Sequence, residues 1–236
     1  MKKENELTIE ILYPGFILYG DRGNVEYLEK TFPEAQMIYT SIDDKPYFVD
    51  HEVDLIYMGP MTETNLDLAT DHLLPHAHRL KDLMEQGCFF LIINSALEIF
   101  GEWIELPDGR RLKTLKLLPF TTKRNMADRH DTTVMGTFKG QQIIGYDARF
   151  TEQYGNETMA FLTLEKGYGF NRKSKQEGVH YKNFIGTNLM GPILVMNPPL
   201  IKHIKGELTG NQDIPYENYM EAGYKIRLEK FSEFKE

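Results

Sequence analysis

The segment best suited to covalent chemistry lies near the middle of the chain. Residues 88–93 form the most apolar run of the sequence, and Asn94 and Ser95 follow it directly and lead into the mainly apolar residues 96–100. This order predicts a buried strand, a sharp turn and a short helix, which is the geometry of a nucleophile elbow. Such a turn presents a nucleophile to an acyl carbon, and it needs oxyanion-hole amides and a proton-transferring histidine beside it.

Two side chains stand at this turn. The carboxamide of Asn94 does not attack a carbonyl at neutral pH, whereas Ser95 carries the one hydroxyl of the turn. The glycines of a Gly-x-Ser-x-Gly pattern are absent, and no histidine partner can be assigned to Ser95. We therefore keep Ser95 as an alternative nucleophile. Asn94 suits the turn itself, because asparagine tolerates a positive φ better than most residues.

The single thiol of the chain belongs to Cys88. One cysteine excludes an intramolecular disulfide and a cysteine-based metal cluster within one chain. Cys88 precedes Asn94 by six residues, which at about 3.3 Å per strand residue corresponds to on the order of 20 Å, at the opposite end of the sheet. We interpret it as a packed thiol in a protein of a reducing compartment.

Histidines are the candidate bases and metal ligands. His72 and His76 are spaced i, i+4 on one expected helix that also carries His78, but no His-Glu-x-x-His pattern is present and an amphipathic helix accounts for all three. His130 and His180 are candidate bases, and we interpret His180 as a residue of a surface loop. We expect no metal and no cofactor.

The elements that must position the turn follow from apolar periodicity. Segments 7–13, 35–39, 53–58 and 88–93 are typical of parallel strands buried on both faces. A helix is expected after residues 20–24, with Asp21 or Asn24 near its N-cap, and another over residues 65–86. In the second half, residues 132–138, 141–146, 159–164 and 183–187 predict short strands separated by turns, and residues 200–205 end a helix.

These elements predict an α/β fold of three layers, with a mostly parallel sheet and extra, partly antiparallel strands in the second half. We expect one domain over residues 1–205. A charged tail over residues 206–236 follows, helical from Tyr216 or Glu217 onward.

Composition excludes several classes of function. The 236 residues include 41% hydrophobic side chains, enough for a sizeable core. Because 35 acidic residues outnumber 27 basic ones, for a net charge of −8, the chain lacks the basic excess that binds nucleic-acid phosphates. The N-terminal segment is too charged for a signal peptide or a membrane span. We expect a cytoplasmic protein that binds neither nucleic acid nor membrane.

Two motif blocks resemble a known family. The first comprises residues 12–14 and 18–24, Leu-Tyr-Pro and Leu-Tyr-Gly-Asp-Arg-Gly-Asn; the second comprises residues 167–171, 177–183, 186–187, 191–194 and 197–198. Together they are similar to the signatures of class-I-like glutamine amidotransferases related to cobyric acid synthase, in particular the small glutaminase (GatD-type) subunits of lipid II isoglutaminyl synthase. The resemblance covers residues 7–205 and implies the class-I amidotransferase fold. It also implies that Tyr19, Arg22 and Asn24 shape the site, although helix capping and ion pairing are structural alternatives for them.

The chain departs from this family at three functional positions. Asn94 stands where the family has its nucleophilic cysteine, and Met190 stands where it has its histidine base. In place of the family's Gly-Gly-Gly-Gln loop the chain has Gly59, Pro60 and two further residues, and a proline supplies no N–H to an oxyanion hole.

Loss at three separate positions predicts a catalytically degenerate subunit with a binding or scaffolding role. The resemblance implies an ATP-dependent, Mur-ligase-like partner that amidates a cell-wall precursor or a related acid. Two alternatives remain open. One is a protein that binds a glutamine-like small molecule without turnover, and the other is an active amidotransferase or hydrolase that uses Ser95.

Overall fold

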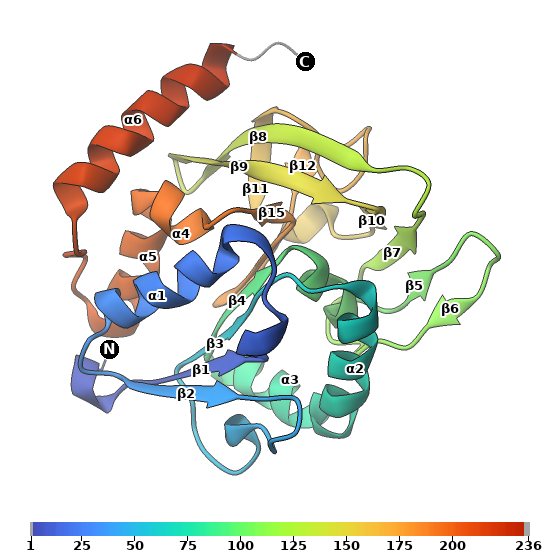
Figure 1. Ribbon diagram of the computed structural model, residues 1–236, viewed down its shortest axis with the longest axis horizontal. Helices are drawn as coiled ribbons and strands as arrows, with labels where there is room; N and C mark the ends of the chain where they lie inside the picture. Colours follow the sequence, from blue (N-terminus) through green and yellow to red (C-terminus); the bar gives the residue numbers. More distant parts are fainter. Residues whose placement is uncertain (1, 234–236) are drawn as a thin grey trace.

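The central sheet positions the turn that follows residue 93. The computed structural model describes residues 2–233, and its main sheet has the strand order β13-β14-β4-β3-β1-β2 (Figure 1). All neighbouring strands are parallel except β13 and β14. The strands are β1 (Thr8–Leu12), β2 (Gln36–Thr40), β3 (Leu55–Met58), β4 (Phe89–Ile93), β13 (Val179–Tyr181) and β14 (Phe184–Thr187). The four parallel strands expected in the first half are confirmed.

Helices cover both faces of this sheet, because alternate strand residues point to opposite sides. Leu55 and Tyr57 of β3 pack in one core with α1 and α5, whereas Ile56 and Met58 pack in a second core with α2 and α3. The fold is therefore the expected three-layer α/β arrangement. The helices are α1 (Arg22–Thr31), α2 (Glu63–Leu73), α3 (Ala77–Gln86), α4 (Ile193–Met196), α5 (Pro198–Thr209) and α6 (Glu217–Glu233).

The second half of the chain adds two smaller sheets. One has five antiparallel strands in the order β12-β11-β8-β9-β15, and the other has the order β10-β7-β5-β6. Val134 and Ile143 of the five-stranded sheet join the core on the α1 side of the main sheet. The strands are β5 (Ile104–Glu105), β6 (Arg111–Leu112), β7 (Thr121–Arg124), β8 (His130–Phe138), β9 (Gln141–Arg149), β10 (Thr151–Tyr154), β11 (Leu162–Lys166), β12 (Gln176–Glu177) and β15 (Leu189–Met190).

One expectation about helices is wrong. The helix expected over residues 65–86 is divided at Pro75, because proline lacks the N–H that a continuous helix requires. His72 and His76 therefore do not share one helix. The short helix expected after β4 is present as a 3₁₀ helix, η6 (Asn94–Phe100). The other 3₁₀ helices are η1 (Glu4–Glu6), η2 (Pro14–Phe16), η3 (Tyr19–Asp21), η4 (Tyr47–Val49), η5 (Leu74–His76) and η7 (Glu157–Met159).

The C-terminal segment is a helix, as expected, and it lies against the domain (Figure 1). Three side chains of α6, those of Met220, Tyr224 and Phe231, are buried. The Tyr224 hydroxyl donates to the Gln142 carbonyl over 2.6 Å. The boundary expected at residue 205 falls inside α5. Among residues 2–233, no helix combines the length and the apolar character that a membrane crossing requires.

Candidate functional site

The turn after β4 has the backbone of a nucleophile elbow. Asn94 has a φ of 55°, in the left-handed region, which confirms the expectation for this position. Its side chain is nearly buried, and Nδ2 donates to the Asn188 carbonyl over 2.6 Å. The carboxamide thus joins the elbow to the segment between β14 and β15, and the elbow persists without a nucleophilic group.

Ser95 is bound to the neighbouring loop by two hydrogen bonds. Its hydroxyl donates to the Met61 carbonyl over 2.8 Å and accepts from the Met61 N–H over 3.0 Å. In this loop Pro60 supplies no N–H, and the Pro60 carbonyl accepts from Leu18. An amide at the position expected for an oxyanion hole is therefore already engaged by a serine hydroxyl.

Gly59 has a packing role at the start of the same loop. A Cβ at this position would lie 3.0 Å from the Ile17 side chain and 3.2 Å from the Tyr57 hydroxyl. Such contacts are tighter than ordinary van der Waals packing, so a side chain here would displace its neighbours. The absence of a side chain at residue 59 is explained without a catalytic role.

Met190 lies on the other side of the elbow, in β15. It pairs with Tyr146 of β9 and is partly exposed. Its thioether accepts hydrogen bonds only weakly and does not transfer protons near neutral pH. This position therefore contributes no general base.

The first motif block and the last one are joined directly. The Asn24 Oδ1 accepts from the Leu194 N–H over 2.9 Å, and the Asp21 Oδ2 accepts from the Gly191 N–H over 3.1 Å. Asn24 Nδ2 also donates to Asp21 over 2.9 Å. Asp21 is the N-cap residue of α1, as expected, but its side chain makes no capping hydrogen bond there. Burial raises the pKa of Asp21 to about 6, although its hydrogen bonds with Gly191 and Asn24 act in the opposite direction.

The other two residues of this motif lie nearer the surface. Tyr19 is 60% exposed and has a φ of 58°. Arg22 is the first residue of α1 and is exposed. Of the two, Tyr19 borders the elbow cavity described next.

A cavity of about 130 Å³ opens at the elbow. It brings together Tyr19, Asn94 and Ser95 from the expected set, whereas Arg22, Asn24, Gly59, Pro60 and Met190 lie outside its lining. The lining also carries four charged residues that sequence reasoning did not assign to the site, namely Glu63, Glu98, Arg129 and Arg149. The cavity is therefore polar and carries both signs of charge.

Glu98 lies on η6, four residues beyond Asn94, and is fixed by two partners. Arg124 Nη2 lies 2.9 Å from Glu98 Oε2, and the Thr151 hydroxyl donates to Oε1 over 3.2 Å. Burial raises the pKa of the Glu98 carboxyl, while Arg124 and Thr151 act in the opposite direction. The buried ion pair anchors the elbow helix to the small sheet that contains β7 and β10.

Arg149 reaches the cavity from the end of β9. Its Nη2 donates to the carbonyls of Gly169 and Phe170, and its Nε lies 3.2 Å from Asp147 Oδ2. Nη1 is buried and has no hydrogen-bond partner among residues 2–233. Burial raises the pKa of Asp147 to about 6, while Arg149 acts in the opposite direction. An arginine with a free donor is a group that can receive a carboxylate.

A buried polar network fixes the segment that accepts the hydrogen bond of Asn94. Glu177 Oε1 accepts from the Asn188 N–H over 2.6 Å, and Oε2 accepts from the Thr187 hydroxyl over 2.8 Å. Asn188 Nδ2 also donates to Gln153 over 3.1 Å. The Asn188 carbonyl that receives Asn94 is thereby held in place, so the elbow, β12 and β10 form one connected unit.

The histidines and the cysteine lie elsewhere. His180 is not in a surface loop; it is half-buried in the edge strand β13, where its ring lies 5.0 Å from that of Phe138, because β13 pairs with β14. His130 is buried beside Glu152, and the His72 ring nitrogen bonds the Tyr13 hydroxyl. Within the described part of the chain, no histidine borders the elbow cavity.

Cys88 is buried immediately before β4, at the end of the strand opposite to Asn94. Burial raises the pKa of its thiol well above the ordinary value, which makes it a poor nucleophile. In the described residues, no group of three or more His, Cys, Asp or Glu side chains is arranged to hold a metal ion.

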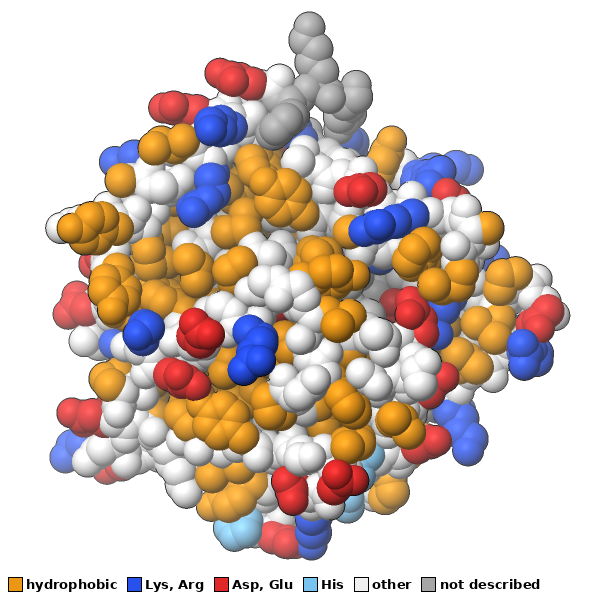
Figure 2. Space-filling view, in the orientation of Figure 1, with side chains coloured by type: hydrophobic (Ala, Val, Ile, Leu, Met, Phe, Trp, Pro, Cys, Tyr) orange, Lys and Arg blue, Asp and Glu red, His pale blue; other side chains and the backbone are white. Residues whose placement is uncertain are grey.

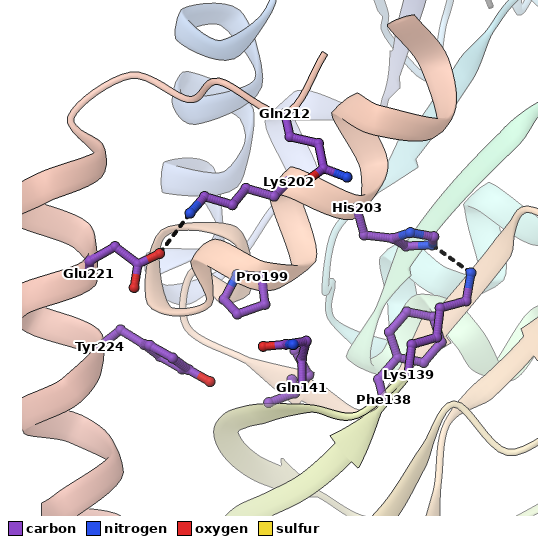
Figure 3. Close-up of a pocket in the computed structure, with 10 residues that line it drawn as sticks. Phe138, Lys139, Gln141, Pro199, Lys202, His203, Gln212, Glu221 and Tyr224 are labelled. Carbon is purple, nitrogen blue, oxygen red and sulfur yellow. Dashed lines mark hydrogen bonds and ion pairs between the residues drawn. The ribbon is translucent and has the colours of Figure 1, made fainter. Parts of the chain in front are cut away.

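A larger cavity, of about 410 Å³, lies between α5, α6 and the β8–β9 hairpin (Figure 3). Lys202 is paired there with Glu217 and Glu221 of α6, at 2.8 Å each. Lys139 Nζ lies 3.4 Å from His203 Nε2 on the far side. The ion pairs of Lys202 hold α6 on the domain, and this cavity shares no residue with the elbow.

Comparisons with known proteins agree with this architecture. The chain is 28% identical over 217 residues to the lipid II isoglutaminyl synthase (glutamine-hydrolyzing) subunit GatD of Staphylococcus aureus, covering 90% of this chain and 88% of the relative. It is 23% identical over 203 residues to the subunit of the same name from Streptococcus pneumoniae, covering 83% and 77%. A solved glutamine amidotransferase from Thermotoga maritima superposes with a TM-score of 0.53 at 10% identity, over 97% of this chain and 99% of that one, and so supports the fold.

A family model also spans most of the sequence. Residues 9–198 match the CobB/CobQ-like glutamine amidotransferase domain, a range that includes the elbow and both motif blocks. The chain therefore belongs to the CobB/CobQ-like glutamine amidotransferase family.

Proposed function

We propose that this chain is a glutamine amidotransferase-type subunit that does not hydrolyse glutamine and acts by binding a partner. The proposal rests on two hydrogen bonds at the elbow. The Asn94 carboxamide donates to the Asn188 carbonyl, and the Met61 N–H donates to the Ser95 hydroxyl. A thiol nucleophile and a free oxyanion-hole amide, which acyl transfer needs, are both replaced by structural hydrogen bonds.

The partner is an ATP-dependent, Mur-ligase-like enzyme that amidates a cell-wall precursor or a related acid. This part of the proposal is supported by the names of the two relatives, each of which is a subunit of lipid II isoglutaminyl synthase. With no glutaminase in the complex, ammonia would come from solution. The complex would reside in the cytoplasm, where ATP is available.

A second candidate function is the binding of a glutamine-like small molecule without turnover. It is favoured by Arg149, which lines the cavity and has a buried Nη1 with no hydrogen-bond partner among the described residues. A ligand carboxylate would pair with this donor, and Glu63 or Glu98 would face its amino group. The cavity, at about 130 Å³, suits a molecule no larger than an amino acid.

Hydrolysis by Ser95 is the least supported alternative. Its hydroxyl proton is directed to the Met61 carbonyl, not to a base. A serine nucleophile requires a histidine or lysine to remove that proton. This alternative would be supported only if the wild type hydrolysed glutamine and Ser95→Ala abolished that activity.

The test is the release of ammonia and glutamate from glutamine by the purified chain, with an active glutaminase measured in parallel. We expect no release above the uncatalysed background. Turnover of about 1 per second or faster, in the range of ordinary enzymes, would overturn the proposal. Thermal melting with and without glutamine tests the second candidate, since a ligand of the folded state raises the melting temperature.

The partner is tested separately by co-expression with candidate ATP-dependent ligases and measurement of the mass of the complex. A stable complex supports the binding role. A chain that remains alone with every such ligase would contradict it, whatever the outcome of the glutaminase assay.

A further inference from the structure

A basic segment stands out in this acidic chain. Residues 110–124 contain six basic residues and no acidic one, although the whole chain has a net charge of −8. The basic residues are Arg110, Arg111, Lys113, Lys116, Lys123 and Arg124. Arg124 is buried against Glu98, and the other five reach the surface. Arg110 and Arg111 lie in the β5–β6 hairpin, which projects from the right-hand side of the molecule in Figure 1, and the other basic residues follow it.

This segment borders an apolar groove of about 520 Å³. Trp103, Leu74, Leu112 and Leu115 line it together with three basic residues, Arg111, Lys113 and Lys116, and one acidic residue, Glu102. In the orientation of Figure 2, apolar, basic and acidic side chains lie side by side at the right-hand edge, where the hairpin projects. The groove therefore offers apolar contact and an excess of positive charge.

The cations of the groove are available to a ligand. Lys113 and Lys116 are exposed and have no acidic partner among residues 2–233, and the Arg111 guanidinium lies over the Trp103 ring at 4.1 Å.

The floor of the groove is rigid. The N–H groups of Leu115, Lys116 and Leu117 donate to the carbonyls of Ile99, Gly101 and Phe100, over 2.7, 3.1 and 3.0 Å. These carbonyls belong to the end of η6 and the residue after it, so the groove is built on the elbow helix. A preformed groove loses little entropy when it is occupied.

We propose that this groove is the docking site of an acidic, leucine-bearing peptide segment of a partner protein. Charge complementarity selects an acidic segment, and the apolar lining selects one with aliphatic side chains. Nucleic acid is disfavoured, because only Lys113 and Lys116 among the groove cations have no acidic partner in the described residues, and two cations are few for a phosphate backbone. The inference is independent of the proposed function, since the groove and the elbow cavity share no lining residue.

Trp103 allows a direct test, because it is the only tryptophan of the chain. The probe is a short peptide in which glutamate and leucine alternate, titrated while the fluorescence of Trp103 is recorded. We expect a saturable change, since the peptide carboxylates compete for Arg111. Polyglutamate, a lysine–leucine peptide and oligothymidylate are measured in the same way, and all three should bind at least about tenfold more weakly if apolar contact and negative charge are both required.

Charge reversal locates the site. Lys113→Glu/Lys116→Glu should weaken binding of the glutamate–leucine peptide about tenfold or more, by turning two attractions into repulsions. The matched control is Lys225→Glu/Lys230→Glu on α6, which changes the net charge equally on the opposite side of the molecule and should leave the affinity unchanged.

Three results would overturn the inference. They are an unchanged Trp103 signal with the glutamate–leucine peptide, equal weakening in both charge-reversed variants, and oligothymidylate binding that matches the peptide. Lys113→Gln/Lys116→Gln, which only removes charge, provides the same comparison should the reversed variant be poorly folded.

Discussion

Ser95 and Met61 exchange two hydrogen bonds, so one serine hydroxyl satisfies both the N–H and the carbonyl of a single loop residue. This pair closes the loop after β3 onto the elbow after β4. A vacant N–H in that loop would be available to a developing oxyanion. The pair therefore bears on whether activity can be restored by supplying the missing nucleophile and base alone.

We predict that restoring the two catalytic side chains is insufficient. Asn94→Cys/Met190→His should release ammonia from glutamine slowly, because Ser95 still occupies the Met61 N–H. Adding Ser95→Gly should raise the rate by about 10²-fold, the usual effect of one oxyanion-hole donor. The initial rate of ammonia release measures this. Equal rates in the double and triple variants would mean that the Met61 amide takes no part.

Asn94 should be important for stability rather than for chemistry. Asn94→Ala removes the bond to Asn188 and places alanine at a φ of 55°, and we expect it to lower the free energy of unfolding by about 2 kcal/mol. Asn94→Gly removes the same bond without the backbone penalty, so its loss should be about 1 kcal/mol smaller. Urea unfolding of both variants measures the difference. Equal losses would show that the backbone of residue 94 is not strained.

The buried pair of Glu98 and Arg124 should respond asymmetrically to substitution. Arg124→Met leaves the Glu98 carboxylate buried without its cation, and we expect a loss of about 3–5 kcal/mol in the free energy of unfolding. Glu98→Gln/Arg124→Met removes both charges and should be more stable than Arg124→Met. Denaturant midpoints provide the comparison, and a double variant less stable than Arg124→Met would contradict it.

Glu177 should make the free energy of unfolding decrease as the pH rises from about 4.5 to about 7. Burial raises the pKa of Glu177 to about 7, above its ordinary value of 4.5. In this window the folded chain retains a proton that the unfolded chain has released, so deprotonation favours unfolding. The contribution is at most about 3 kcal/mol.

Glu177→Gln removes that titration and should flatten the dependence. Urea unfolding at about pH 5 and about pH 8 is compared between the variant and the wild type, because other carboxylates contribute equally to both. The decline between the two values should be smaller in the variant. An identical decline would show that Glu177 is ionised across the whole range.

The strands β1, β2, β3, β4 and β14 of the main sheet could be predicted because each is a short, mainly apolar run between turn residues. The edge strand β13 was not predicted, and its segment was expected to be a surface loop. The small strands β5, β6, β7 and β10 were not predicted, since two to four residues with polar neighbours give no periodic signal. The division of the helix at Pro75 was predictable from that residue alone. The 3₁₀ form of η6 depends on its contacts with other segments, which local spacing does not encode.

At the site, the positive φ of Asn94 followed from residue type and position. The pairing of Glu98 with Arg124 did not, because the partners are 26 residues apart and only the fold brings them together. Arg149 gave no signal, because its place at the cavity follows from the end of β9 and not from a local pattern. The roles of Tyr19, Arg22 and Met190 in binding stay predictions.

The two hydrogen bonds that join Asp21 and Asn24 to residues 191 and 194 also have a consequence for folding during synthesis on the ribosome. Asn24 and its partner Leu194 are separated by 170 residues. At about 5–20 residues per second, a ribosome needs on the order of ten seconds to span that distance. Until then the first four strands can pair, but Asp21 Oδ2 and Asn24 Oδ1 lack the backbone donors that they have in the folded protein. The nascent N-terminal half therefore stays incomplete, and its final packing waits for the last fifth of the polypeptide.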